Sequence, residues 1–159
     1  AHCGVPMTSD NAPYLLERAR YHMDAEQYRP AMVDYDAYYD AVKGNVNDMF
    51  YFYREQASFH ARQFQRALDD INKASEINPQ DLTYRSELAV INIRVGRYEE
   101  AVKALNDALA IDSNYAEAYR LMGIAQIQLK KNQEACSSFA KAKELGDPNV
   151  DTLIEKHCK

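Results

Sequence analysis

Apolar residues recur along this chain with a period of 34 residues. Small residues keep the spacing most clearly: Ala67, Ala101 and Ala135, and then Ala74, Ala108 and Ala142. Between the two alanine series, Ile71, Leu105 and Phe139 follow the same period. A fixed period of this size is typical of a helical array, in which each unit is a helix pair that buries its apolar face only against its neighbours. Such an array chiefly offers a surface for holding another protein.

The helical periodicity within each unit predicts nine helices, and alternating apolar and polar runs typical of strands are scarce. Turn and cap residues such as Asn78-Pro79 and Gly146-Asp147-Pro148 separate the predicted helices. The expected helix ranges are 12–25, 28–43, 48–61, 64–77, 82–95, 98–111, 116–129, 132–145 and 149–157. The last helix has Val150, Leu153 and Ile154 on one face, which predicts a helix that caps the end of the array.

The clearest unit carries a recognisable set of small and large residues: Tyr119, Met122, Gly123, Ala135, Phe139, Ala142 and then Pro148. These residues resemble the tetratricopeptide repeat (TPR), in which small residues let helix backbones approach and large residues fill the space between them. The resemblance implies an all-α, right-handed α-solenoid of about four helix pairs with a C-terminal capping helix. The expected parts are a flexible arm (1–11), an array (12–147, in units 12–47, 48–81, 82–115 and 116–147) and a capping helix (148–159).

Four departures from the TPR pattern stand out. Arg54 and Glu55 occupy places where leucine and a small residue are expected, so we expect the first helix of that unit to be rotated or shifted. Tyr38 replaces a small residue, which predicts looser packing at the amino end. Residues 44–47 absorb a slip of about two residues, and Lys130-Lys131 replace the turn glycine.

In the TPR family the first helices of the units line a concave groove. The resemblance therefore implies these partner-binding residues: Arg20, Met49, Phe52, Gln56, Phe59, His60, Val90, Ile93, Arg94, Arg120, Ile124 and Ile127. An apolar floor with arginines at intervals suits an extended peptide or an amphipathic helix that carries some acidic residues. Two alternatives stay open. A register shift would bury Phe52 and Phe59, and the aliphatic residues could simply pack against a neighbouring helix.

Two TPR subtypes lack their characteristic residues here. The chaperone-binding subtype clamps a carboxylate with lysine, asparagine and arginine. Starting from the second unit, those places hold Phe52, Gln56, Glu87, Glu117 and Leu121, and starting from the first they hold Leu16, Arg20, Tyr53, Thr83 and Glu87. The asparagine ladder of protein O-GlcNAc transferases is replaced by Glu17, Tyr53, Glu87 and Leu121. We therefore expect neither of these functions.

Composition and charge narrow the partners further. The 159 residues are 47% hydrophobic and 27% charged, which is enough for a packed core. The net charge is −5, with 24 acids, 19 scattered bases and no basic block, which argues against nucleic acid. No apolar run approaches the roughly 18 to 20 residues of a membrane span, so we expect no membrane insertion. The expected partner is a protein or peptide.

The side chains give little support for catalysis, a metal or a cofactor. The chain contains no Gly-rich phosphate loop, no His-Glu-x-x-His and no Cys-x-x-Cys. The dipeptides His2-Cys3 and His157-Cys158 could share zinc only if the two ends met, which a long array prevents within one chain. An odd count of three cysteines provides no complete disulfide framework and slightly favours a cytoplasmic location, with an exported protein whose signal has been removed left open. Cys136 is expected to be a partly buried small apolar residue.

These observations favour a non-catalytic protein-interaction scaffold. One alternative is the substrate-selecting repeat region of a larger enzyme, such as a glycosyltransferase. Another is self-association into a homo-oligomer through an exposed patch of tyrosines: Tyr35, Tyr38, Tyr39, Tyr51 and Tyr53. Packing of these rings in an ordinary repeat core is the simpler explanation of the cluster.

Overall fold

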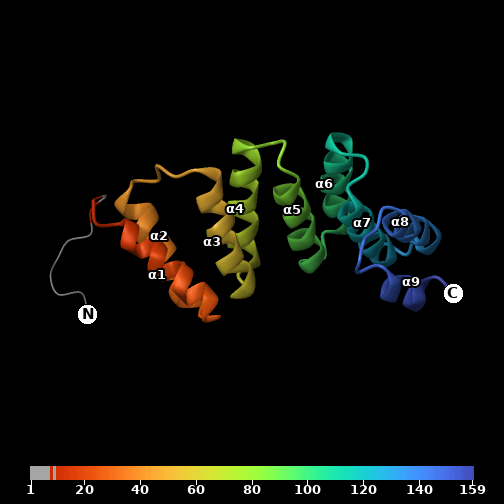
Figure 1. Cartoon of the computed structure of the whole chain (residues 1–159), viewed down its shortest axis with the longest axis horizontal. Coiled ribbons are helices and arrows are strands. Elements are labelled where there is room, and N and C mark those ends of the chain that lie inside the picture. The colour runs from red at the N-terminus through yellow and green to blue at the C-terminus, as the bar shows by residue number, and fades with distance from the viewer. Residues whose placement is uncertain (1–7, 9) are drawn as a thin grey trace. The chain divides into compact units, whose positions relative to one another are not determined.

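The structure, a computed structural model, describes residue 8 and residues 10–159. Most of the arm predicted over 1–11 therefore lies outside the described residues. Within them the chain forms nine helices and no strand (Figure 1). The helices are α1 (Pro13–Asp24), α2 (Tyr28–Ala41), α3 (Asp48–His60), α4 (Phe64–Ile77), α5 (Leu82–Arg94), α6 (Tyr98–Ile111), α7 (Ala116–Gln128), α8 (Asn132–Glu144) and α9 (Asp151–His157). The all-α prediction is confirmed.

The helices divide into two compact units, each of which contains two repeats. From here on, the first unit is the one that ends at Asn78, and the second unit is the one that begins at Pro79. In the first unit α1 packs against α2, α2 against α3, and α3 against α4. Its core gathers small and aromatic residues: Ala19, Ala31, Met32, Tyr35, Phe50 and Ala57. The small residues let the helices approach closely, and the rings fill the space beside them.

Helix α3 is not rotated or shifted, so that expectation is wrong. Its buried residues Phe50, Glu55 and Ala57 lie 34 residues before Tyr84, Ala89 and Ile91, which are the buried residues of α5. Glu55 is fully buried at the place of a small residue, and the Gln56 side-chain amide donates a hydrogen bond to its carboxylate. The register therefore continues through the unusual residues.

Two ionic contacts, each with a nearly buried aspartate, link helices of the first unit, and one of them accommodates Arg54 where leucine is usual. Arg54 on α3 donates two hydrogen bonds to Asp70 on α4, at 2.8 and 2.9 Å. Arg18 on α1 makes the same bidentate contact with Asp34 on α2, at 2.9 and 2.7 Å. Each pair is 16 residues apart in the sequence. Each therefore links the two helices of one repeat with charge-assisted hydrogen bonds.

The second unit consists of two helix pairs and the capping helix. One cluster of its core joins α5, α6 and α7 around Ala89, Leu105 and Met122. Another joins α8 to the segment after it, around Phe139 and Val150. Gly123 on α7 lies directly against the ring of Phe139, so closely that a Cβ atom at residue 123 would overlap the ring. This glycine therefore sets the approach of α7 to α8.

The turn inside each helix pair has one backbone conformation. Glu26, Arg62, Gly96 and Lys130 all have φ between 57° and 82°, in the left-handed region. In each turn the amide of this residue donates to the carbonyl three residues earlier, at 3.0 to 3.1 Å. Such bonds are typical of an α-helix that ends in a residue with left-handed φ, a conformation that glycine adopts with least strain. Only one of the four turns has glycine at this position.

Cys136 on α8 forms a disulfide with Cys158, just after α9. Cys136 is partly buried as expected, but it is paired in a disulfide and is not a free apolar side chain, and the argument from the odd cysteine count is wrong. An odd count leaves one cysteine over but does not prevent the other two from pairing. The support that this count lent to a cytoplasmic location is removed as well.

Candidate functional site

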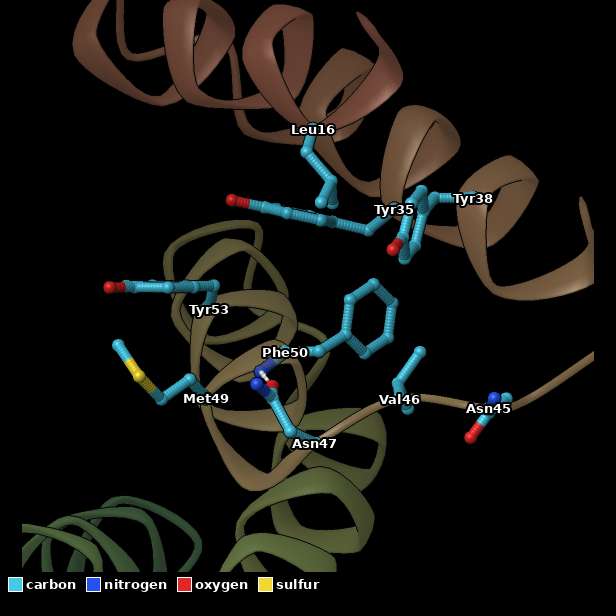
Figure 2. Close-up of a pocket in the computed structure, with 9 residues that line it drawn as sticks. All are labelled: Leu16, Tyr35, Tyr38, Asn45, Val46, Asn47, Met49, Phe50 and Tyr53. Carbon is cyan, nitrogen blue, oxygen red and sulfur yellow. Dashed lines mark hydrogen bonds between the residues drawn. The ribbon is translucent and has the colours of Figure 1, made fainter. Parts of the chain in front are cut away.

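The first unit contains an open cavity of about 550 Å³ between its first three helices. Figure 2 shows the residues that line it. They are Leu16 from α1, Tyr35 and Tyr38 from α2, Asn45, Val46 and Asn47 from the connecting loop, and Met49, Phe50 and Tyr53 from α3. Short connections hold these elements together, so the cavity belongs to the packing of two successive repeats.

Three aromatic rings make the inner wall of this cavity. Phe50 is buried at 5% exposure, and its ring centre lies 5.8 Å from that of Tyr35 and 5.6 Å from that of Tyr38. Figure 2 shows Tyr35 and Tyr38 beside the Phe50 ring, with Met49 and Tyr53 on the side of Phe50 away from Val46; the Tyr35 ring meets the Phe50 ring edge-on, at 87°. Met49 and Tyr53 remain 48% and 46% exposed. The cavity therefore has a fixed aromatic interior and an apolar rim that is open to solvent.

The polar groups of the cavity are neutral. Asn47 caps α3 by accepting a hydrogen bond from the Phe50 amide at 2.9 Å. Burial raises the pKa of Tyr35 to about 12, so its phenol stays protonated at physiological pH. No charged side chain is among the described residues that line the cavity. The arrangement suits an apolar side chain better than a phosphate or carboxylate group.

The predicted groove residues of the first unit are only partly brought together by the structure. Met49 lines the cavity, while Phe52, Gln56 and Phe59 lie half-buried elsewhere on α3. Phe59 contacts Phe64 at 5.6 Å between ring centres. Arg20 and His60 are exposed, and His60 stacks on Tyr28.

The predicted groove residues of the second unit divide between core and surface. Val90, Ile93 and Ile124 pack against the core cluster of α5, α6 and α7, and Ile127 packs against the Phe139 cluster. All four stay partly exposed. Arg94 is exposed.

Arg120, another predicted groove residue, already has partners inside the protein. Its Nε donates to Asp147 at 3.0 Å, and Glu117 lies 3.9 Å from its Nη2. The guanidinium of Arg120 therefore neutralises a nearly buried aspartate. An external acidic group would have to compete with this contact.

The groove prediction missed most of the cavity. Tyr35, Tyr38, Val46 and Tyr53 line it but are not among the predicted binding residues. Two sequence signals pointed to them, since Tyr38 replaces a small residue and Tyr53 occupies a place where some TPR proteins have a ligand-binding asparagine. Tyr38, the large ring at a small-residue place, lies directly in the wall of the cavity.

The tyrosine cluster is mainly core rather than an exposed patch. Tyr35 is buried, and Tyr38, Tyr39 and Tyr51 are partly buried around Phe50. The Arg54 guanidinium lies 4.7 Å from the ring centre of Tyr39 and 5.2 Å from that of Phe50. These contacts extend the aromatic packing by cation–π attraction.

The part of the chain that the structure describes contains neither a metal-ligand group nor a membrane-spanning helix. No group of three or more His, Cys, Asp or Glu side chains there could hold a metal ion. Within the same residues, no helix has the length and apolar character that crossing a membrane requires.

The helix pairs, their common turn and the 34-residue register define a helical-repeat protein. Residues 10–108 match the family model described as "Anaphase-promoting complex, cyclosome, subunit 3", which is more than half of the chain. Residues 93–130 match the model described as "TPR repeat". The chain therefore belongs to the first of these families, and it is a tetratricopeptide-repeat protein.

Characterised relatives and solved structures agree with this assignment. The small glutamine-rich tetratricopeptide repeat-containing protein 2 of Mycosarcoma maydis is 29% identical over 58% of this chain and 26% of its own length. The SGT1 homolog of Bos taurus is 29% identical over 60% of this chain and 28% of its own length. The chain thus spans about a quarter of the length of these curated relatives.

Among solved structures, YrrB is described as "a TPR protein with an unusual peptide-binding site". It matches with a TM-score of 0.82 at 19% identity, over 93% of this chain and 76% of that one. The likeness confirms the TPR solenoid fold class.

Proposed function

We propose that this chain is a non-catalytic protein-interaction scaffold that binds a peptide or helix segment of a partner protein. The open aromatic cavity of the first unit carries the proposal. Its interior is pre-formed by Phe50, Tyr35 and Tyr38, so little ordering is needed when a ligand enters. Half-exposed Met49 and Tyr53 at the rim can close over an apolar anchor, and aromatic rings are common in the energetic centre of such contacts.

The predicted groove residues of the first unit supply the rest of the proposed surface. Phe52 and Phe59 extend an apolar strip along α3 beyond the cavity, and the exposed Arg20 of the same unit can attract acidic side chains. The proposed ligand therefore carries one large apolar residue and nearby acidic residues. The peptide-binding site named for YrrB supports this proposal by analogy of fold.

A second candidate is a substrate-selecting region of a larger protein. It is favoured by the small share of the curated relatives that this chain covers. Both candidates use the same surface, and they differ in what is attached to it. Sequencing the complete open reading frame separates them, because a catalytic domain in the same frame identifies the second.

The test begins with selection of binding peptides from a displayed random library on the immobilised protein. The selected peptide is then titrated by calorimetry into the wild type and into Tyr53→Ala and Met49→Ala. Tyr21→Ala is the matched control, since Tyr21 is 70% exposed and lies outside the cavity. We expect the Tyr53 variant to bind about tenfold more weakly and the control to bind like wild type. Equal affinity of all four proteins would contradict the proposal.

A further inference from the structure

The capping helix α9 is held by few contacts of its own. It has seven residues, and none of them is fully buried. Val150 just before it is buried, and Leu153 and Ile154 pack beside Val150 against Phe139, Ala135 and Ala142. A helix this short does not persist alone in water, because its few hydrogen bonds do not offset the cost of nucleation. The helix α9 therefore forms only while its residues are held against α8.

A covalent link supplies much of that attachment. The Cys136–Cys158 disulfide joins α8 to the residue after α9, with the two Cα atoms 5.7 Å apart. Beside it, the His157 ring stacks over the Phe139 ring at 6.3 Å. The ion pair of Lys143 with Asp151 joins two exposed side chains and contributes little. The disulfide fixes the end of the capping segment, and Val150 anchors its start in the core.

We propose that the Cys136–Cys158 disulfide is a redox-sensitive latch for the capping helix. In the oxidised protein α9 covers Phe139, whose exposure is 0%. In the reduced protein the segment from Asp151 detaches and uncovers the apolar face of α8. Both cysteines are partly exposed, so a reductant can reach the bond.

The chemical step is thiol–disulfide exchange with a dithiol reductant. A thiolate of the reductant attacks the sulfur of one cysteine, and the other cysteine leaves as a thiolate and takes up a proton. The second thiol of the reductant then displaces the first cysteine from the mixed disulfide. The products are two cysteine thiols in the protein and one disulfide in the reductant, so two electrons pass to the protein.

Amide hydrogen exchange tests the latch most directly. Cys3→Ser is used as the background, so that Cys136 and Cys158 form the single possible pair within the chain. The amides of Ile154 and Cys158, which donate to Val150 and Ile154, report on α9. On reduction with dithiothreitol we expect these amides to exchange on the order of 100-fold faster, from the loop-closure effect of a disulfide of this span. The amide of Ala108 in α6 should be unchanged.

Two further measurements keep the proposal falsifiable. The Cys136→Ser/Cys158→Ser variant should show fast exchange in both redox conditions, with the circular dichroism of a folded helical protein. The reduced protein should also bind more of an apolar fluorescent dye as Phe139 is uncovered, and reoxidation should reverse both changes. Equal exchange of Ile154 and Cys158 before and after reduction would overturn the latch. So would a mass that shows free thiols after air oxidation.

Discussion

The buried pair Arg54–Asp70 is the feature that distinguishes the first unit most sharply from the second. Thirty-four residues later, the same two places hold Leu88 and Ala104, which pack in the core of the second unit. The chain therefore contains its own apolar version of this contact. Replacing Arg54 with leucine and Asp70 with alanine converts one repeat to the pattern of the other.

The expected magnitudes follow from burial. The Arg54 and Asp70 side chains are 13% and 7% exposed. Burial opposes the charge on Arg54, but hydrogen bonding to Asp70 and the charge of that carboxylate outweigh burial and raise the pKa of Arg54, so the guanidinium stays charged. Arg54→Leu leaves a buried carboxylate and should cost about 3 kcal/mol. Asp70→Ala should cost less, about 2 kcal/mol, because Asp36 remains 3.4 Å from the guanidinium.

The double variant should lie within about 1 kcal/mol of wild type, since it removes both charges and leaves neither unpaired. Urea unfolding of all four proteins, followed by circular dichroism, completes a double-mutant cycle. We expect a coupling energy of about 4 kcal/mol between the two substitutions. Additive losses, with the double variant about 5 kcal/mol less stable than wild type, would refute the assignment of this pair as a compensated buried contact.

Three other predictions test the packing, the turns and the aromatic cluster. Gly123→Ala should destabilise the protein by about 1 to 2 kcal/mol in thermal unfolding, because the overlap of the new Cβ with the Phe139 ring costs more than the gain in helix propensity. In a Phe139→Leu background the same substitution should cost much less, and a more stable Gly123→Ala protein would contradict the close approach of α7 to α8. At the turn residues with left-handed φ, Arg62→Gly should raise the free energy of unfolding by about 1 kcal/mol and Gly96→Ala should lower it by about 1 kcal/mol, because only glycine adopts this φ without strain. Changes of the same sign in both variants would show that backbone strain does not decide the outcome. Because burial raises the pKa of Tyr35 to about 12, the free energy of unfolding should fall as pH rises from about 10 to 12. Tyr35→Phe should remove the phenolate transition near pH 12 from the ultraviolet titration, and an unchanged titration curve would show that another tyrosine is responsible.

Much of the fold follows from the spacing of small residues. The ranges predicted for two second helices, 64–77 and 98–111, coincide with α4 and α6. The capping helix was expected from residue 149 and begins at Asp151. A close approach of helices needs small side chains at fixed places, so a repeated alanine reports directly on packing. The departures at Arg54 and Glu55 did not change the register, because Asp70 pairs with the Arg54 guanidinium and the Gln56 amide donates a hydrogen bond to the Glu55 carboxylate.

The ionic pairs could have been predicted from the sequence more readily than the disulfide. Arg18 with Asp34 and Arg54 with Asp70 share one separation, and this coincidence was available as a signal. The disulfide required knowing that the capping segment returns to α8. The cavity was less accessible, since its shape depends on how rings such as Tyr38 and Phe50 orient against each other. Side-chain orientation is set by packing rather than by periodicity.

The central claim is that the first unit binds a peptide through its aromatic cavity, and nuclear magnetic resonance tests this most directly. The backbone amides of the labelled protein are followed while the library-selected peptide is added. The account predicts that the largest shifts fall on Leu16, Tyr38, Met49 and Tyr53, and that they are smaller in Tyr53→Ala at the same, subsaturating peptide concentration. Shifts confined to α8 and α9, with the cavity residues unmoved, would contradict it.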